Sequence, residues 1–300
     1  MAKKKIKFTK EDLQRDEVLE LSERAIIWFR LHGNKLLTAV AVVFLAWAAV
    51  IFYNQRQEAT LRSASNMFYE AAQQYEATLQ EHEWATPERT EGMREVVDKA
   101  QAVIDEYGNT PVARNALFLK GNAYYFAGDE IGSVGNTQEA VRVFTEYEEL
   151  AAQEGDAFER AAALLALGYA HENMYLLLVR NPEEAVQALV AAMDYYRQIE
   201  DLGDETGFLR YEAMNARARL LAFQDQIEQA EELYREVVRA RYRPQPELTP
   251  ETPDAQRTLQ DLQFLAGQFT TGNTARMQLQ RMGIDVEAIE EEIRAEQRAG

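Results

Sequence analysis

The stretch LFLKGNAYYFAGDEIGSVGNTQEAVRVFTEY, residues 117–147, contains the pattern that decides the fold. Each half of it combines one small residue with two large apolar ones at helical spacing. A Gly or Ala in that position lets two antiparallel helices approach closely, while the large side chains fill the seam between them. Residues 129–136, between the halves, predict a loop. The two patterns are Leu117-x3-Gly121-x2-Tyr124 and Ala140-x3-Phe144-x2-Tyr147.

The first pattern recurs after this stretch and the second recurs on both sides of it, at intervals of 40 to 50 residues, which is a sign of a helical repeat. The last unit has the shortest spacing between its two helices, and the third unit needs extra residues, which we expect near Leu178–Pro182. The arrangement resembles the tetratricopeptide repeat. We therefore predict an all-α fold with a tetratricopeptide-like α-solenoid over residues 56–243. The recurrences are Ala100-x3-Ile104-x2-Tyr107, Leu164-x3-Gly168-x2-His171, Ala185-x3-Leu189-x2-Ala192, Met214-x3-Ala218-x2-Leu221 and Ala230-x3-Tyr234-x2-Val237.

Upstream of the repeats, residues 36–55 contain no charged side chain. The run LLTAVAVVFLAWAAVIF, residues 36–52, is apolar except for Thr38. As a helix it would cover roughly 25–30 Å, the thickness of the hydrocarbon core of a bilayer. A cleaved signal peptide is the alternative, but the segment before the run is too long and too mixed in charge for one. We predict a single transmembrane helix over residues 36–55.

Charge is distributed unevenly on the two sides of this helix. Residues 1–35 carry nine basic and six acidic side chains, whereas residues 36–300 carry 23 basic and 44 acidic ones. Near the span, nine basic residues precede it and only Arg56 and Arg62 lie in the roughly twenty residues after it. The positive-inside rule therefore places the N-terminal segment in the cytoplasm and the body on the other side of the membrane. So acidic a body would repel a phosphate backbone, and nucleic acid is not an expected partner.

The segments flanking the span have helical patterns of their own. Residues 17–31 form an amphipathic pattern that predicts a helix on the inner leaflet, or one docked on a membrane partner, ending at Gly33-Asn34. Between Leu36 and Thr86 there is neither Gly nor Pro, so we expect the span to continue as one long helix. Its outer part has an apolar stripe: Ala64, Met67, Phe68, Ala71, Ala72, Tyr75 and Leu79.

After Arg243 the composition changes. Four of the seven prolines lie within residues 244–253, which predicts a connector. Residues 254–268 predict a helix that caps the solenoid, and residues 285–298 predict an acidic helix that is either solvated or packed on the body or a partner. Residues 244–300 are thus the fourth region of the chain, after residues 1–35, 36–55 and 56–243.

The sequence lacks the usual signatures of catalysis and metal binding. There are no cysteines, and the three histidines lie far apart, so thiolate or histidine metal sites are not expected. No nucleophile elbow, phosphate loop or dinucleotide fingerprint is present. Runs of carboxylates fall on predicted helices, where they are normally solvated. We expect no enzymatic activity and no cofactor.

A stack of helix pairs can offer a groove lined by the first helix of each pair. Aromatic and amide side chains there would suit an extended peptide, because rings bury apolar side chains and amides bind the peptide backbone. The alternative is that these residues pack on the loop insert or on the long first helix. The candidate groove residues are Asn115, Phe118, Asn122, Tyr125, Phe126, Tyr169, Asn173, Asn215 and Arg219.

The order of parts resembles the YfgM-type ancillary subunit of the bacterial SecYEG translocon. The resemblance lies in the basic start, the pattern Trp28-x4-Gly33-x2-Leu36-Leu37 opening the anchor, and residues 68–70 and 100–111. It implies a bacterial inner-membrane protein with its body in the periplasm, contacting translocon subunits and periplasmic chaperones without catalysis. The alternative is an architectural subunit of another large envelope or energy-transducing membrane complex, integrated in a hetero-oligomer.

Overall fold

The computed structural model describes residues 10–130 and 132–240, together with positions 260, 279, 281–284, 288, 291 and 295. Apart from turns, these residues are helical, and no strand occurs among them. The predicted all-α fold is confirmed. The chain divides into two units, residues 1–60 and residues 61–300.

Helix α1, Lys10–Glu81, contributes to both units. It continues through Gly33 and Asn34, so the expected break at these residues is wrong, whereas the unbroken helix from residue 36 to residue 81 is confirmed. One part of α1 is apolar and long enough to cross a membrane, and among the described residues none of this part is buried. Leu45, for example, is 71% exposed.

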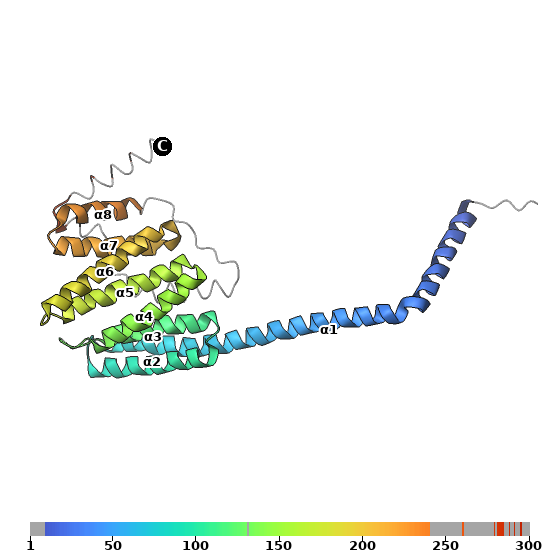
Figure 1. Ribbon diagram of the computed structural model, residues 1–300, viewed down its shortest axis with the longest axis horizontal. Helices are drawn as coiled ribbons and strands as arrows, with labels where there is room; N and C mark the ends of the chain where they lie inside the picture. The colour runs from blue at the N-terminus through green and yellow to red at the C-terminus, as the bar shows by residue number, and fades with distance from the viewer. Residues whose placement is uncertain are drawn as a thin grey trace, which may run out of the picture. The chain divides into compact units, whose positions relative to one another are not determined.

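The second unit is a stack of helices in which each helix packs on the next along the chain (Figure 1). Alternate helices also touch, α3 with α5 and α5 with α7, which is the arrangement of a solenoid. The elements are α2 (Pro87–Tyr107), α3 (Pro111–Ala127), α4 (Gly135–Glu154), α5 (Ala157–Leu177), α6 (Pro182–Leu202), a 3₁₀ turn η1 (Asp204–Thr206), α7 (Phe208–Phe223) and α8 (Ile227–Ala240).

Local signals in the sequence define several helix starts. Pro87, Pro111 and Pro182 each open a helix, where the missing amide proton costs nothing. The hydroxyls of Thr86 and Thr110 accept hydrogen bonds from amides in the first turns of α2 and α3. Such caps satisfy backbone donors that a helix cannot pair internally.

The core joins the last turns of α1 to the stack. Four positions of the predicted stripe, Ala64, Phe68, Ala71 and Tyr75, are buried there with side chains of α2 and α3. At the crossing of α1 and α2, a Cβ added to Gly92 would lie 2.6 Å from Cγ2 of Thr78. The outer part of α1 therefore acts as the first helix of the stack.

Glycine–aromatic contacts close the seams of the central pairs. A Cβ on Gly121 would lie 2.4 Å from the Phe144 ring, as the repeat pattern predicts. A Cβ on Gly168 would lie 2.3 Å from the ring of Tyr196, not against Leu189. The third unit is therefore in register through Ala192-x3-Tyr196-x2-Ile199, two helical turns beyond the predicted motif.

The extra residues of the two enlarged units lie in different places. The loop between α3 and α4 covers residues 128–134, close to the predicted 129–136. Between α5 and α6 only residues 178–181 intervene, so the expected insertion near Leu178–Pro182 is wrong. The third unit is longer because α5 and α6 each have 21 residues.

Arg89, at the start of α2, connects the first two helix pairs. Its Nε donates to the carbonyl of Phe126 at 2.8 Å, and one terminal nitrogen donates to the carbonyl of His82 at 3.0 Å. The hydroxyl of the neighbouring Thr90 donates to the carbonyl of Ala127 at 3.2 Å. Buried Arg89 thus satisfies carbonyls at the C-terminal ends of α1 and α3.

Few residues beyond α8 are described. Leu279 is buried against α7 and α8, with Met282 and Ile284 partly buried beside it. These residues cover the apolar side of the last pair. The capping helix expected over residues 254–268 lies outside the described residues except for position 260, as does the helix expected over residues 285–298 except for positions 288, 291 and 295.

Candidate functional site

Aromatic and charged side chains from four helices meet around one ion pair, which we term the Glu172–Arg219 cluster: Tyr125 on α3, Tyr169 and Glu172 on α5, Tyr196 on α6 and Arg219 on α7. One guanidinium nitrogen of Arg219 lies 2.7 Å from both carboxylate oxygens of Glu172. The hydroxyl of Tyr196 donates to the same carboxylate at 3.1 Å. The guanidinium carbon lies 5.8 Å from the centroid of the Tyr169 ring, a cation–π distance.

The electrostatics of the cluster favour one ionisation state. Burial raises the pKa of Tyr125, Tyr169 and Tyr196, so the phenols stay neutral. Burial alone would lower the pKa of Arg219, but Glu172 and the surrounding tyrosines outweigh it and the pKa is raised. Arg219 is therefore a permanent cation held by a carboxylate.

A cluster in this state is suited to holding α3, α5, α6 and α7 together. The carboxylate of Glu172 accepts hydrogen bonds from both a guanidinium and a phenol, which come from two other helices. Partly buried pairs of this kind restrict the geometry of the groups around them.

Three of the nine predicted groove residues, Tyr125, Tyr169 and Arg219, meet in this cluster from three successive first helices. Four others lie in the interior. Phe118 packs on the rings of Phe144 and Tyr147, with centroids 5.4 and 5.1 Å away. Asn115, Asn122 and Asn215 are also buried. Because α3 is packed on α2, α4 and α5, its inner face is core and not an open groove wall.

The remaining groove residues, with Tyr125, pack as the alternative interpretation expected. The rings of Tyr125 and Phe126 lie 5.9 and 6.0 Å from Trp84, which follows α1, and Phe126 also packs on Tyr75 of α1. The Asn173 amide donates to the hydroxyl of Thr137 at 3.1 Å. These side chains fix the first helix and the loop to the stack.

The loop between α3 and α4 is held by a small polar network. The carboxylate of Asp129 accepts from the amides of Asn136 and Thr137 and from the Thr137 hydroxyl, at 2.6–3.0 Å. The amide of Gly132 donates to the carbonyl of Leu177 at 3.1 Å. The loop is thereby tied to the end of α5.

Sequence reasoning missed Glu172, although a signal for it was present. Counted from the small residue of each first helix, Glu172 follows Gly168 by four positions, as Tyr125 follows Gly121. On the same count Arg219 matches Tyr169. Aligning the helices at this position would have placed Glu172 on the same face as Tyr125, Tyr169 and Arg219.

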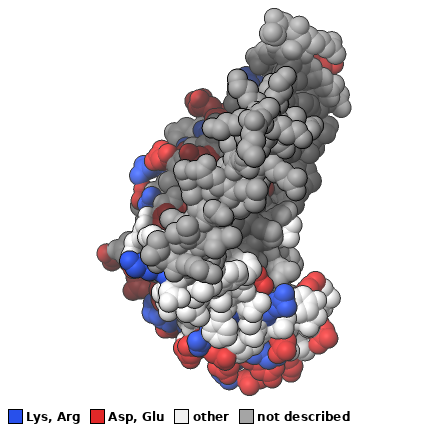
Figure 2. All heavy atoms as spheres, turned by 90° about the vertical axis from the view of Figure 1, so that its right-hand side faces the viewer, with Lys and Arg blue, Asp and Glu red and all other residues white. Residues whose placement is uncertain are grey.

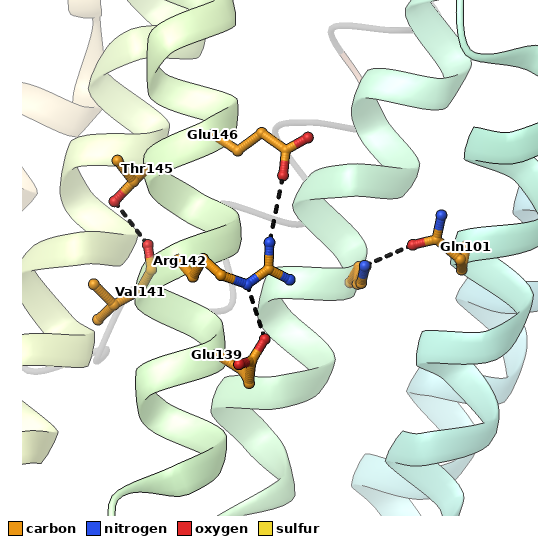
Figure 3. Close-up of polar contacts among 7 residues, drawn as sticks. Gln101, Glu139, Val141, Arg142, Thr145 and Glu146 are labelled. Carbon is orange, nitrogen blue, oxygen red and sulfur yellow. Dashed lines mark hydrogen bonds and ion pairs between the residues drawn. The ribbon is translucent and has the colours of Figure 1, made fainter.

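Several other charged side chains form pairs on the exposed surface. Arg142 lies between Glu139 and Glu146 on the exposed face of α4, and a 2.6 Å hydrogen bond joins Lys120 of α3 to Gln101 of α2 (Figure 3). In Figure 2 acidic and basic side chains are interspersed where described residues are visible. Such exposed pairs contribute little stability.

No candidate metal site occurs in the part of the chain that the structure describes, as judged by groups of three or more His, Asp or Glu side chains. His171 lies half-buried with its ring centroid 5.4 Å from that of Tyr195, and burial lowers the pKa of the imidazole. It packs as a neutral ring within the stack.

Comparison of the chain with protein-family models, with curated proteins and with solved structures gives no match.

Proposed function

We propose that this protein is a non-enzymatic, membrane-anchored scaffold whose tetratricopeptide-like stack mediates protein–protein interactions. The observation that carries the proposal is the change of character along α1. As far as the described residues show, its apolar part is exposed, whereas residues 61–81 bury an apolar stripe in the stack. A membrane would supply the missing apolar environment for the first part.

The proposed partners are translocon subunits and periplasmic chaperones, with the N-terminal segment in the cytoplasm. The support is the resemblance in sequence to the translocon subunit family and the excess of basic residues before the span. Anchoring would keep the body at high effective concentration near emerging chains.

Affinity capture after mild solubilisation tests this proposal. The tagged full-length chain is expected to recover translocon components or periplasmic chaperones. A matched control carries Val43→Arg and Leu45→Arg, which prevent insertion and should abolish recovery. Recovery of neither class of protein with the unaltered chain would overturn the proposed partners.

The orientation has a separate test, because the chain contains no cysteine. Cysteine is introduced at Ser22 or at Ser133, which is exposed in the loop between α3 and α4. In intact spheroplasts an impermeant maleimide should label Ser133→Cys and leave Ser22→Cys unlabelled. The reverse pattern would overturn the topology.

A second candidate function is an architectural subunit of another large envelope or energy-transducing complex. It is favoured by the engagement of Tyr169, Asn173 and Arg219 with neighbouring helices, since a static interface needs no open groove. Detergent washing separates the two functions. An architectural subunit should stay in a stoichiometric complex, whereas a transient partner should be lost.

A further inference from the structure

The turns that follow α1, α3, α5 and α7 form one continuous edge of the stack. A Cβ on Gly128, after α3, would lie 3.1 Å from backbone atoms of Ala85, after α1. The amide of Gly132 donates a hydrogen bond to the carbonyl of Leu177, the last residue of α5. The ring of Tyr175, in the last turn of α5, lies 5.9 Å from the ring of Phe223 at the end of α7.

Large apolar side chains are exposed at the far part of this edge. They surround the turns α5–α6 and α7–α8, and Phe223 and Val179 are 67% and 62% exposed. Val186 and Val190 extend the row along one face of α6, four residues apart. We term this set the apolar edge: Leu176, Val179, Val186, Val190, Phe223 and Ile227.

The opposite edge differs in composition. Its turns, residues 108–110, 155–156 and 203–207, contain no exposed large apolar side chain among the described residues. Carboxylates near it are paired with arginines, as Glu154 is with Arg114 and Glu200 with Arg217. The concentration of apolar side chains at one edge is therefore a feature of these turns and not of the whole surface.

Charge around the apolar edge limits what could cover it. Exposed carboxylates flank the apolar side chains, and none of them has a basic partner within 4.0 Å among the described residues: Glu183, Glu184, Asp225 and Glu228. Arg180 is the only Lys or Arg in the four turns of this edge. An anionic lipid surface would be repelled, and so would the same edge of a second copy.

We propose that the apolar edge binds an amphipathic segment of a partner chain, with apolar side chains on one face and Lys or Arg beside them. The apolar face would cover Val186, Val190 and Phe223. The basic side chains would pair with the carboxylates at the starts of α6 and α8. This names a partner class for the scaffold proposed above and rests on that proposal.

A designed peptide serves as the probe. It has Leu at i, i+3, i+4 and i+7 and Lys elsewhere, and it is offered to the full-length chain in phosphatidylcholine nanodiscs, with empty nanodiscs subtracted. Gln187→Cys, at an exposed position of α6 outside the apolar edge, carries an environment-sensitive dye. Binding of the basic peptide should change the dye signal and weaken with added salt. Peptides with Glu in place of Lys, or with the same composition scrambled, should not bind.

Two double variants locate the site. Val186→Ser with Phe223→Ser should weaken binding about tenfold, whereas Tyr69→Ser on exposed α1 should leave it unchanged. Glu183→Gln with Glu184→Gln should reduce the salt dependence, and the control Glu95→Gln with Asp98→Asn should not. All substituted side chains are exposed, so the fold should be retained.

Four outcomes would overturn the proposal: no binding of the basic peptide, equal binding of the acidic one, a dye response to phosphatidylglycerol nanodiscs alone, or efficient cross-linking of two copies through Gln187→Cys. These outcomes leave membrane retention and partner capture unaffected. A negative result for peptide binding at the apolar edge can therefore be distinguished from a negative result for the proposed scaffold function.

Discussion

Two parts of α1, which we call its first half (residues 37–53) and its second half (residues 61–81), both contain many apolar residues but lie in different surroundings. In residues 37–53 the apolar side chains point in all directions and are exposed, with Phe52 68% exposed. In residues 61–81 they form one stripe, and Phe68 is 5% exposed against α2 and α3. An unbroken apolar run suits lipid on all sides, whereas an apolar stripe at helical spacing suits a protein core on one side.

The strongest test of this contrast introduces charge into the first half. Val43→Arg with Leu45→Arg should cost about 3 kcal/mol for each arginine at the centre of a membrane helix. We expect the chain to leave the membrane fraction in alkaline extraction. The control, Gln57→Arg with Thr60→Arg, alters exposed positions beyond the apolar run and should remain in the membrane. Equal retention of both variants would mean that these residues do not anchor the chain.

Substituting one phenylalanine in each half should change the free energy of unfolding by different amounts. Phe68→Ala removes a buried ring and should lower the free energy of unfolding of the stack by about 3–5 kcal/mol. Phe52→Ala, at an exposed position, should leave it unchanged. Urea unfolding followed by circular dichroism measures both. A similar loss from each variant would show that the two halves share one packed environment.

Alanine substitutions at two glycines, one in a tight helix contact and one in open space, should have a smaller effect on stability. Gly168→Ala places a methyl group 2.3 Å from a Tyr196 ring atom, and overpacking of about 1–3 kcal/mol should exceed the helix propensity gain of about 1 kcal/mol. Gly135→Ala has no atom within 4 Å and should be neutral or stabilising. If thermal unfolding shows Gly168→Ala to be as stable as the unaltered chain, the seam between α5 and α6 is looser than described.

The smallest expected effect concerns the ionisation of Glu200, a half-buried carboxyl group at the end of α6. Burial raises the pKa of Glu200 to about 7, although Arg217 at 2.5 Å lowers it. The protonated form is favoured by folding, so its stabilising effect is present below the ordinary carboxyl pKa and is lost as pH rises through about 7.

Glu200→Gln removes this dependence. Between pH 5 and pH 8 the stability of the variant relative to the unaltered chain should rise by about 1–2 kcal/mol, as measured by urea unfolding at each pH. The control Glu95→Gln, on the exposed face of α2, should show no such trend. A relative stability that falls with pH would mean that pairing with Arg217 outweighs burial.

Much of the fold follows from local sequence. Pro87, Pro111 and Pro182 mark helix starts, and the stripe of α1 predicts which side chains are buried. The register of the third unit could not be predicted from the local sequence, because α6 repeats its apolar pattern after seven residues. Leu189 and Tyr196 therefore lie on one face of the helix, and only the distant Gly168 decides between them.

The candidate site was predictable in part. Helical alignment placed Tyr125, Tyr169 and Arg219 on one side of the stack, and they do meet. The ion pair between Glu172 and the guanidinium of Arg219 depends on the separation of α5 and α7. No local sequence pattern specifies that separation. The same limit applies to Asn115 and Phe118, whose face is covered by neighbouring helices.

The position of Arg89 has a consequence for how the stack comes apart. Its guanidinium satisfies carbonyls of two hairpins, so peeling the first hairpin away would strand a buried charge and expose unpaired backbone groups at once. The first hairpin should not fray on its own. Melting should begin at the α8 end, and α2 and α3 should be the last helices of the stack to lose protection against hydrogen exchange.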